Sequence, residues 1–172
     1  MHVLVVGGAG YIGSTTAAAF LEAGHTVTVF DNLSRGHQAA IPLGAAFVRG
    51  DLADKAALDT LFQMGKFDAV AHFAALIEAG ESMVKPSLYF TNNVAYSQNL
   101  FEAMLTHNVK RLVFSSTAAV YASKNATLNE DDPYAPANVY GETKLMIEGM
   151  IRWYHRQVGL KYCILRYFNA CG

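Results

Sequence analysis

The sequence predicts an α/β fold built on a doubly wound parallel sheet flanked by helices. Two observations support this prediction. Short apolar runs and helical patterns alternate from one end of the chain to the other, which is typical of consecutive βαβ units. A glycine-rich turn also joins the first apolar run to the first helical pattern. No linker, repeat or run of charge divides the chain, so residues 1–172 are expected to form a single domain.

Six strands and four helices are expected. Strands are predicted at the short apolar runs, residues 2–6, 26–30, 45–49, 68–72, 110–114 and 161–165. Helices are predicted where apolar residues recur at helical spacing, at residues 12–23, 53–64, 87–107 and 139–158. Residues 123–136 are rich in Asn, Asp and Pro and are expected to form a loop on the side of the sheet where ligands bind.

The composition argues against several classes of partner. The chain has 13 Lys and Arg against 14 Asp and Glu, which gives no electrostatic basis for binding nucleic acid or a membrane surface. The first apolar run stops at Gly7, which is too short for a signal peptide or a membrane span. Cys163 and Cys171 suit a reducing cytoplasm, and no His or Cys cluster has metal-site spacing. We therefore expect a cytoplasmic protein without a metal, in which the six histidines are structural.

The glycine turn indicates a phosphate site. Gly7, Gly10 and Gly13 recur every third residue between the first strand and the first helix. Glycines allow backbone N–H groups to approach a phosphate, and the helix directs its positive end to the same place. A glycine-rich turn alone is weak evidence, but this one has the strand before it and the helix after it that a dinucleotide site requires.

Two acidic residues follow the next strands. Asp31 ends the second strand, where a carboxylate can accept hydrogen bonds from an adenosine ribose and would repel a 2′-phosphate. This favours NAD over NADP, although Arg35 could accommodate such a phosphate and Asp31 could be a simple turn residue. Asp51 follows the third strand and is expected either to cap the next helix or to bond an adenine amino group.

A candidate reaction centre follows the fifth strand. Thr117 ends a run of hydroxyl residues, and Tyr140 and Lys144 stand four apart, on one face of a predicted helix. A nearby lysine cation and an oxidised nicotinamide would both favour the phenolate and make Tyr140 a general base, with Thr117 holding the substrate oxygen. Asn92 and Asn93 lie within another predicted helix, and one of them is expected to bond a neighbouring loop.

These features together resemble the UDP-glucose 4-epimerase branch of the extended short-chain dehydrogenase/reductase family, which has a Rossmann-like fold. The resemblance spans essentially the whole chain. The more selective motifs are FSSTAAVY at 114–121 and RYFN at 166–169. The others are GGAGYIGS at 7–14, DNLS at 31–34, GDL at 50–52, HFAA at 72–75, GES at 80–82, NN at 92–93 and YGETK at 140–144.

The resemblance implies which residues bind the cofactor and the sugar. The NAD site it implies comprises Gly7, Gly10, Tyr11, Ile12, Gly13, Asp31, Asn32, Asp51, Leu52, Phe73, Ala74, Ala75, Asn92, Tyr140, Lys144 and Phe168. In it, Tyr11 and Ile12 meet the pyrophosphate, and Phe168 lies near the nicotinamide. The catalytic residues it implies are Tyr140, Lys144 and Thr117, and the sugar nucleotide faces Thr117, Tyr140 and Asn169.

The resemblance also implies a reaction. Relatives interconvert UDP-glucose and UDP-galactose, a step of galactose metabolism: the tyrosine removes the 4-hydroxyl proton, and a hydride passes from C4 to NAD and back through a 4-keto sugar. Their helices at 87–107 and 139–158 pair across a homodimer interface. The apolar residues here that suit either that interface or the core are Tyr89, Tyr96, Phe101, Met104, Met146, Met150 and Trp153.

Some features depart from the family pattern. Ile77 stands where some epimerases carry a lysine that reaches the cofactor, and Ala122 stands where glycine is usual. Relatives continue past RYFN into a C-terminal substrate domain, which a chain ending at Gly172 lacks. Much of the binding energy for the uridine nucleotide is then lost, so NAD binding with weak or absent turnover is expected.

Other functions stay open to different degrees. A sugar-nucleotide 4,6-dehydratase is disfavoured, because Ala118 and Ala119 stand where that branch has an Asp-Glu pair. An epimerase or reductase for another nucleotide sugar is compatible with the motifs. A non-catalytic NAD-binding or dimerisation fragment is the alternative of a different class.

Overall fold

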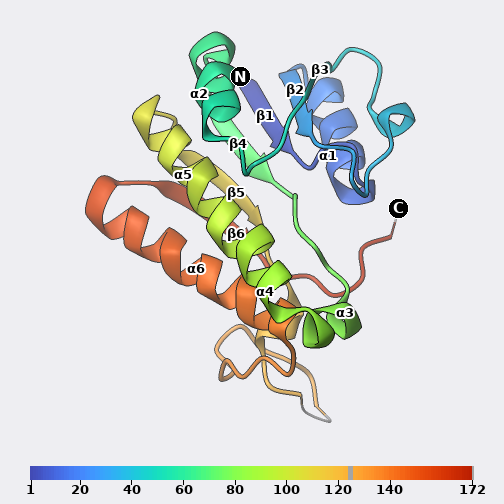
Figure 1. Cartoon of the computed structure of the whole chain (residues 1–172), viewed down its shortest axis with the longest axis vertical. Helices are drawn as coiled ribbons and strands as arrows, with labels where there is room; N and C mark the ends of the chain where they lie inside the picture. The colour runs from blue at the N-terminus through green and yellow to red at the C-terminus, as the bar shows by residue number, and fades with distance from the viewer. Residues whose placement is uncertain (124–125, 172) are drawn as a thin grey trace.

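The structure is a computed structural model that describes residues 1–123 and 126–171. Its strands are β1 (His2–Val6), β2 (Thr26–Asp31), β3 (Ala46–Arg49), β4 (Ala69–His72), β5 (Arg111–Ser115) and β6 (Lys161–Leu165). All five pairings are parallel, and the strand order is β3-β2-β1-β4-β5-β6 (Figure 1). This confirms the predicted doubly wound sheet. The order reverses between β1 and β4, the crevice where such sheets bind ligands.

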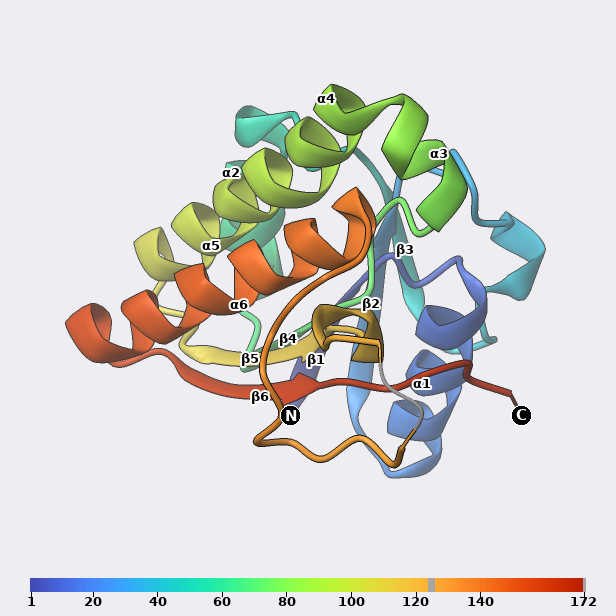
Figure 2. The ribbon, with the colours of Figure 1, turned by 90° about the horizontal axis from the view of Figure 1, so that it is seen from below.

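The helices cover the two faces unequally. α2 (Lys55–Gly65), α5 (Tyr96–Thr106) and α6 (Val139–Val158) lie on one face, and α1 (Tyr11–Glu22) lies on the other (Figure 2). The alternation along β1 shows why its sequence is continuously apolar. Leu4 and Val6 belong to the core under the three helices, whereas Val3 and Val5 belong to the core under α1.

The predicted helix at 87–107 is not one regular helix. Its residues form α4 (Pro86–Tyr89), a π-helical segment η2 (Phe90–Ala95) and α5. The wide turn coincides with Asn93, which is fully buried and bonds the loop after β4: its Oδ1 accepts from the Leu76 N–H and its Nδ2 donates to the Leu76 carbonyl, at 2.8 and 2.9 Å. This answers the question of which asparagine bonds a loop. A short helix, α3 (Ala79–Val84), was not predicted.

The start of α2 corrects one expectation about Asp51. α2 begins at Lys55, because Asp54 is the cap residue and accepts from the backbone N–H groups of Ala56 and Ala57. Asp51 instead accepts from the Ala53 N–H in the preceding turn. Asp51 is therefore not the helix cap.

The remaining segments include short 3₁₀ turns, η1 (Gln38–Ala40) and η3 (Ala118–Val120). The described part of the predicted loop at 123–136 contains no helix, and Tyr134 forms an isolated antiparallel bridge with Tyr121. Asn125, named in that prediction by its residue type, lies outside the described residues. No helix in the described ranges is long and apolar enough to cross a membrane.

Candidate active site

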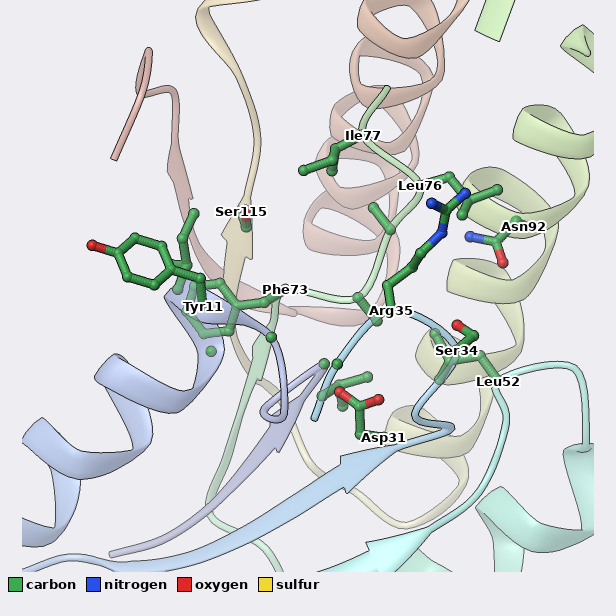
Figure 3. A pocket seen from close by; sticks show the side chains of 18 of the residues that line it. Tyr11, Asp31, Ser34, Arg35, Leu52, Phe73, Leu76, Ile77, Asn92 and Ser115 are labelled. Carbon is green, nitrogen blue, oxygen red and sulfur yellow. The ribbon is translucent and has the colours of Figure 1, made fainter. Parts of the chain in front are cut away.

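A cavity of about 690 Å³ lies at the carboxyl ends of the strands (Figure 3). That volume is within the usual range for small-molecule sites. Its walls come from the glycine turn, the ends of β2 to β5, the start of α6 and the segment after β6. All of the predicted site residues line it: Gly7, Gly10, Tyr11, Ile12, Gly13, Asp31, Asn32, Asp51, Leu52, Phe73, Ala74, Ala75, Asn92, Thr117, Tyr140, Lys144, Phe168 and Asn169.

The three glycines of the turn differ in whether the fold itself requires glycine. Gly7 has φ +79°, and a Cβ there would lie 2.4 Å from the Ala74 nitrogen. A Cβ on Gly13 would lie 2.2 Å from the Gly7 carbonyl oxygen. A Cβ on Gly10 meets nothing closer than 3.4 Å, so the fold itself does not exclude a side chain there. Gly10 is therefore the position where a missing side chain serves the cavity.

The N-terminus of α1 is suited to an anion. Its cap residue is Gly10, which offers no side chain to the N–H groups of the first turn. Those groups have no acceptor within the helix, and they carry the positive end of the helix dipole. Together with the space left by Gly10, they form the kind of site that binds phosphate.

Asp31 is held in place by backbone donors. One oxygen accepts from the Ala9 N–H at 3.0 Å and the other from the Leu33 N–H at 2.8 Å. Asp31 thus joins the glycine turn to the loop after β2, which is more than the role of a simple turn residue. Each carboxylate oxygen can accept a further bond, so a ribose diol can be held there. Beside it, the Asn32 amide donates to Asp51 at 2.8 Å.

The start of α6 brings the reaction residues together. The Asn138 side chain caps the helix by accepting from the Gly141 N–H at 2.8 Å. A Cβ on Gly141 would lie 2.5 Å from the Ala119 carbonyl oxygen, so glycine permits α6 to pack closely on η3. Thr117 caps η3, and Tyr140 is the second residue of α6. Close packing of these two elements places Tyr140 and Thr117 on one wall of the cavity.

Lys144 is buried beside Tyr140. Its Nζ donates to the Ser115 carbonyl oxygen at 2.7 Å and lies 6.0 Å from the centre of the Tyr140 ring. Burial lowers the pKa of Lys144 to about 7, with Glu148 opposing that shift. Near pH 7 the lysine is therefore only partly charged.

The protein's own side chains do not by themselves lower the pKa of Tyr140. The expectation joined Lys144 to an oxidised nicotinamide, and it stays a prediction. Burial raises the pKa of Tyr140 above its ordinary value of 10, and a hydrogen bond with Thr117 only partly offsets this. The nearby Tyr167 adds to this rise, and Lys144 is only partly charged. Tyr140 is consequently a phenol at neutral pH.

Sequence reasoning missed Glu148, a buried residue of α6 that bonds the segments next to Thr117 and Lys144. Glu148 is fully buried on α6 and accepts bonds from Ser116 at 2.6 Å, Arg166 at 2.6 and 2.9 Å, and Arg152 at 3.2 Å. Burial tends to raise the pKa of Glu148, but its hydrogen bonds with Arg166 and Ser116 outweigh burial and keep it below the usual value. The spacing of Tyr140, Lys144 and Glu148, four residues apart each time, was the available signal.

Other predictions can be located in the structure. His72 is buried, and its Nε2 bonds Ser97 at 2.8 Å, which agrees with a structural role.

The residues predicted for the core or a dimer interface differ in exposure. Tyr89, Phe101 and Met104 are fully buried, so these three belong to the core and not to a dimer patch. Met146 and Trp153 on α6 are exposed. Ile77 lines the cavity and supplies no charge there. The described residues contain no cluster of His, Cys, Asp and Glu able to hold a metal ion.

Comparisons with known proteins agree with this geometry. Residues 3–172 match the NAD dependent epimerase/dehydratase family. The chain belongs to that family. Its members include UDP-glucose 4-epimerases to which this chain is similar: 49% identity to that of Halalkalibacterium halodurans and 45% to that of Corynebacterium glutamicum, each over 100% of this chain and 52% of the relative. The chain thus spans about half the length of these curated relatives.

Solved structures show the same relation. A crystal structure of a UDP-glucose 4-epimerase has a TM-score of 0.97 and 46% identity, over 100% of this chain and 53% of the other. That of the Brucella ovis enzyme, in complex with NAD, has a TM-score of 0.96 and 42% identity, over 99% and 53%. These likenesses confirm the Rossmann-like fold and the family resemblance of the sequence. The family is NAD-dependent, and the glycine turn, Asp31 and the helix N-terminus of this chain fit a dinucleotide.

Proposed function

We propose that this chain is the NAD-binding portion of a UDP-glucose 4-epimerase, an isomerase that interconverts UDP-glucose and UDP-galactose. One observation carries the proposal: the glycine turn with Asp31 and the trio Thr117, Tyr140 and Lys144 line one cavity. Asp31 ends β2 and Thr117 follows β5, and β1 and β4 lie between these two strands in the sheet. A dinucleotide held at the glycine turn can therefore extend to the trio.

The proposed roles of the residues follow from their positions. Gly10 and the first turn of α1 hold the pyrophosphate, and Asp31 holds the adenosine ribose. Thr117 orients the sugar 4-hydroxyl, and Tyr140 takes the proton of that hydroxyl. After the 4-keto sugar has turned, C4 takes the hydride back on its other face and Tyr140 returns the proton to O4. Bound oxidised nicotinamide supplies the hydride acceptor and a positive charge. Lys144 holds the nicotinamide ribose, and its buried ammonium adds to the positive charge that favours the Tyr140 phenolate.

NAD binding is tested by calorimetric titration of the 172-residue chain. We expect saturable one-to-one binding, and a matched Asp31→Ala variant to bind NAD more weakly by roughly tenfold, because a ribose hydroxyl loses a charged acceptor. Absence of wild-type binding at millimolar NAD would contradict the proposal.

The chemical step is tested by adding UDP-galactose to the NAD complex and recording the NADH absorbance band. Tyr140→Phe is the control variant, since it retains the ring while removing the proton acceptor. We expect it to bind NAD like the wild type and to abolish any NADH signal, a loss of at least about a hundredfold. A Tyr140→Phe chain that reduces NAD as fast as the wild type would disprove the role of Tyr140.

The same assay separates the alternatives. Because the chain spans about half of its relatives, we expect these 172 residues to bind NAD and to turn over UDP-galactose weakly or not at all. NAD binding without any NADH signal favours a non-catalytic NAD-binding fragment. A signal with another nucleotide sugar and none with UDP-galactose favours a different epimerase or reductase. A homodimer through α5 and α6 is a separate proposal, which the exposed Trp153 and Met146 support.

A further inference from the structure

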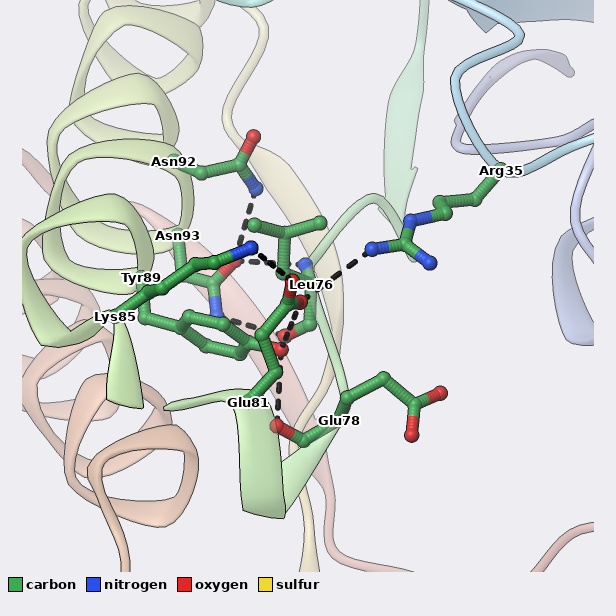
Figure 4. A network of polar contacts seen from close by, with 8 residues as sticks. All are labelled: Arg35, Leu76, Glu78, Glu81, Lys85, Tyr89, Asn92 and Asn93. Atoms are coloured by element: carbon green, nitrogen blue, oxygen red, sulfur yellow. Dashed lines mark hydrogen bonds and ion pairs between the residues drawn. The ribbon is translucent and has the colours of Figure 1, made fainter. Parts of the chain in front are cut away.

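An ion pair joins a residue of the cavity lining to α3. Arg35 follows β2 and lines the cavity, and its Nη2 donates to a carboxylate oxygen of Glu81 on α3 at 3.4 Å (Figure 4). The two residues are 46 positions apart in the chain. Figure 3 shows the Arg35 side chain extending from its own loop toward Leu76 and Asn92 on the opposite wall.

Glu81 does not depend on Arg35. Lys85 and the Tyr89 hydroxyl also donate to its carboxylate, both at 3.1 Å, which is closer than Arg35. The Lys85 and Tyr89 hydrogen bonds lower the pKa of Glu81, so it stays ionised. The Arg35 side chain is 63% exposed, and exposed pairs of this kind contribute little to stability. Arg35 can therefore change partner at small cost.

Among the described residues that line the cavity, no other cation is placed to meet a phosphate. Its acidic lining residues are Asp31, Asp51 and Glu78, which oppose an anion. Lys144, the other basic residue among the described lining residues, is buried with its Nζ on the Ser115 carbonyl. The helix N-terminus contributes only about half a charge, whereas a pyrophosphate diester carries two. Ile77 adds none.

We propose that Arg35 is a pyrophosphate-binding residue, which Glu81 holds at the cavity and releases to a phosphate oxygen when NAD binds. The inference rests on the proposed NAD site and extends it by one residue. Its chemistry is that of guanidinium and phosphate, which form charge-assisted, often paired, hydrogen bonds. Until a phosphate replaces it, the Glu81 carboxylate pairs with the Arg35 guanidinium. It orients the guanidinium toward the cavity without binding it strongly.

The test compares two ligands that differ in the pyrophosphate. Wild type and Arg35→Gln are titrated calorimetrically with ADP-ribose, which contains the pyrophosphate, and with adenosine, which lacks it. We expect Arg35→Gln to weaken ADP-ribose about tenfold and adenosine less than about twofold, because only the first ligand loses a charged contact. Affinity for ADP-ribose should also depend less on NaCl concentration in the variant.

Two further variants identify the role of the pair. Lys85→Gln removes a cation from the same carboxylate at a residue that does not line the cavity, and it should leave both affinities unchanged. Glu81→Gln removes the competing anion and should leave ADP-ribose binding equal or tighter. Circular dichroism of each variant verifies that the fold is retained.

Several results would overturn the inference. Equal weakening of adenosine and ADP-ribose by Arg35→Gln excludes a phosphate contact. The same loss with Lys85→Gln indicates a general charge effect. The same loss with Glu81→Gln indicates that the pair mainly holds the loop after β2 against α3. An effect confined to NADP assigns Arg35 to a 2′-phosphate. Failure of the wild type to bind either ligand overturns the proposed NAD site itself, whereas normal binding unaffected by Arg35→Gln overturns only the role of Arg35.

Discussion

The two ends of the cavity are built by different means. At the proposed adenosine end, formed by the glycine turn and Asp31, the positions are set by backbone geometry: Gly7 has a positive φ, and Asp31 accepts two backbone N–H groups. At the proposed reaction end, formed by Thr117, Tyr140 and Lys144, side chains hold other side chains and segments that are distant in sequence. Lys144 bonds the backbone 29 residues earlier, and Glu148 bonds Ser116 across 32 positions.

This difference determines how each end should respond to substitution. A backbone-built site fails when a residue cannot adopt the required conformation or fit the space. A site built from buried polar side chains fails when one partner is removed and the others lose their bonds. Substitutions that the native backbone conformation tolerates should therefore destabilise the reaction end more than the adenosine end.

The largest effect is expected from removing the buried carboxylate. Glu148→Ala removes the carboxylate that accepts from Arg166 and Ser116, and loss of one member of a buried ion pair costs about 3–5 kcal/mol. Guanidinium denaturation gives the free energy of unfolding. The control is Glu102→Gln, which breaks the exposed pair with Lys55 and should cost at most about 1 kcal/mol. Equal losses of unfolding free energy in the two variants would contradict the importance of buried polar contacts at the reaction end.

The same contrast explains what sequence reasoning could reach. The glycine turn and Asp31 depend on conformations and contacts that follow from local order, strand then turn then helix, so their positions could be predicted. Glu148 was missed because two of its partners, Ser116 after β5 and Arg166 after β6, reach it only in the folded protein. The π-turn at Asn93 was missed because the Leu76 backbone that it bonds lies 17 positions earlier, in a loop without a periodic pattern.

The next effect tests the backbone-built end. Gly7→Ala puts a Cβ 2.4 Å from the Ala74 nitrogen at a positive φ, and we expect a loss of about 2–3 kcal/mol in the free energy of unfolding. Gly10→Ala is its matched control, since a Cβ there is tolerated by the fold. Its stability should change by less than about 0.5 kcal/mol, while its affinity for NAD falls. A Gly10→Ala chain with normal NAD affinity would remove the phosphate role from this position.

A pH effect of intermediate size is expected from Lys144. Its folded pKa of about 7 lies below its ordinary 10.5, so between these values the unfolded chain binds more protons and stability rises with pH. The gain from pH 7 to pH 9 should be about 2 kcal/mol. His72, whose pKa is lowered to about 3 by burial, stays neutral in this window. Lys144→Met should abolish the rise, and a Lys144→Met chain that keeps it would place the titrating group elsewhere.

The smallest effect separates two neighbouring asparagines in the wide turn of η2. Asn93→Ala deprives the half-buried N–H and carbonyl of Leu76 of their partner and should cost about 1–2 kcal/mol. Asn92→Ala removes a side chain whose only hydrogen-bond partner among the described residues is Asn93, and it should cost less than about 0.5 kcal/mol. Hydrogen exchange at the Leu76 amide should accelerate in the Asn93 variant alone. Equal acceleration in both variants would show that the loop after β4 is held by the whole η2 turn, and the reaction end would then depend on backbone shape as much as the adenosine end does.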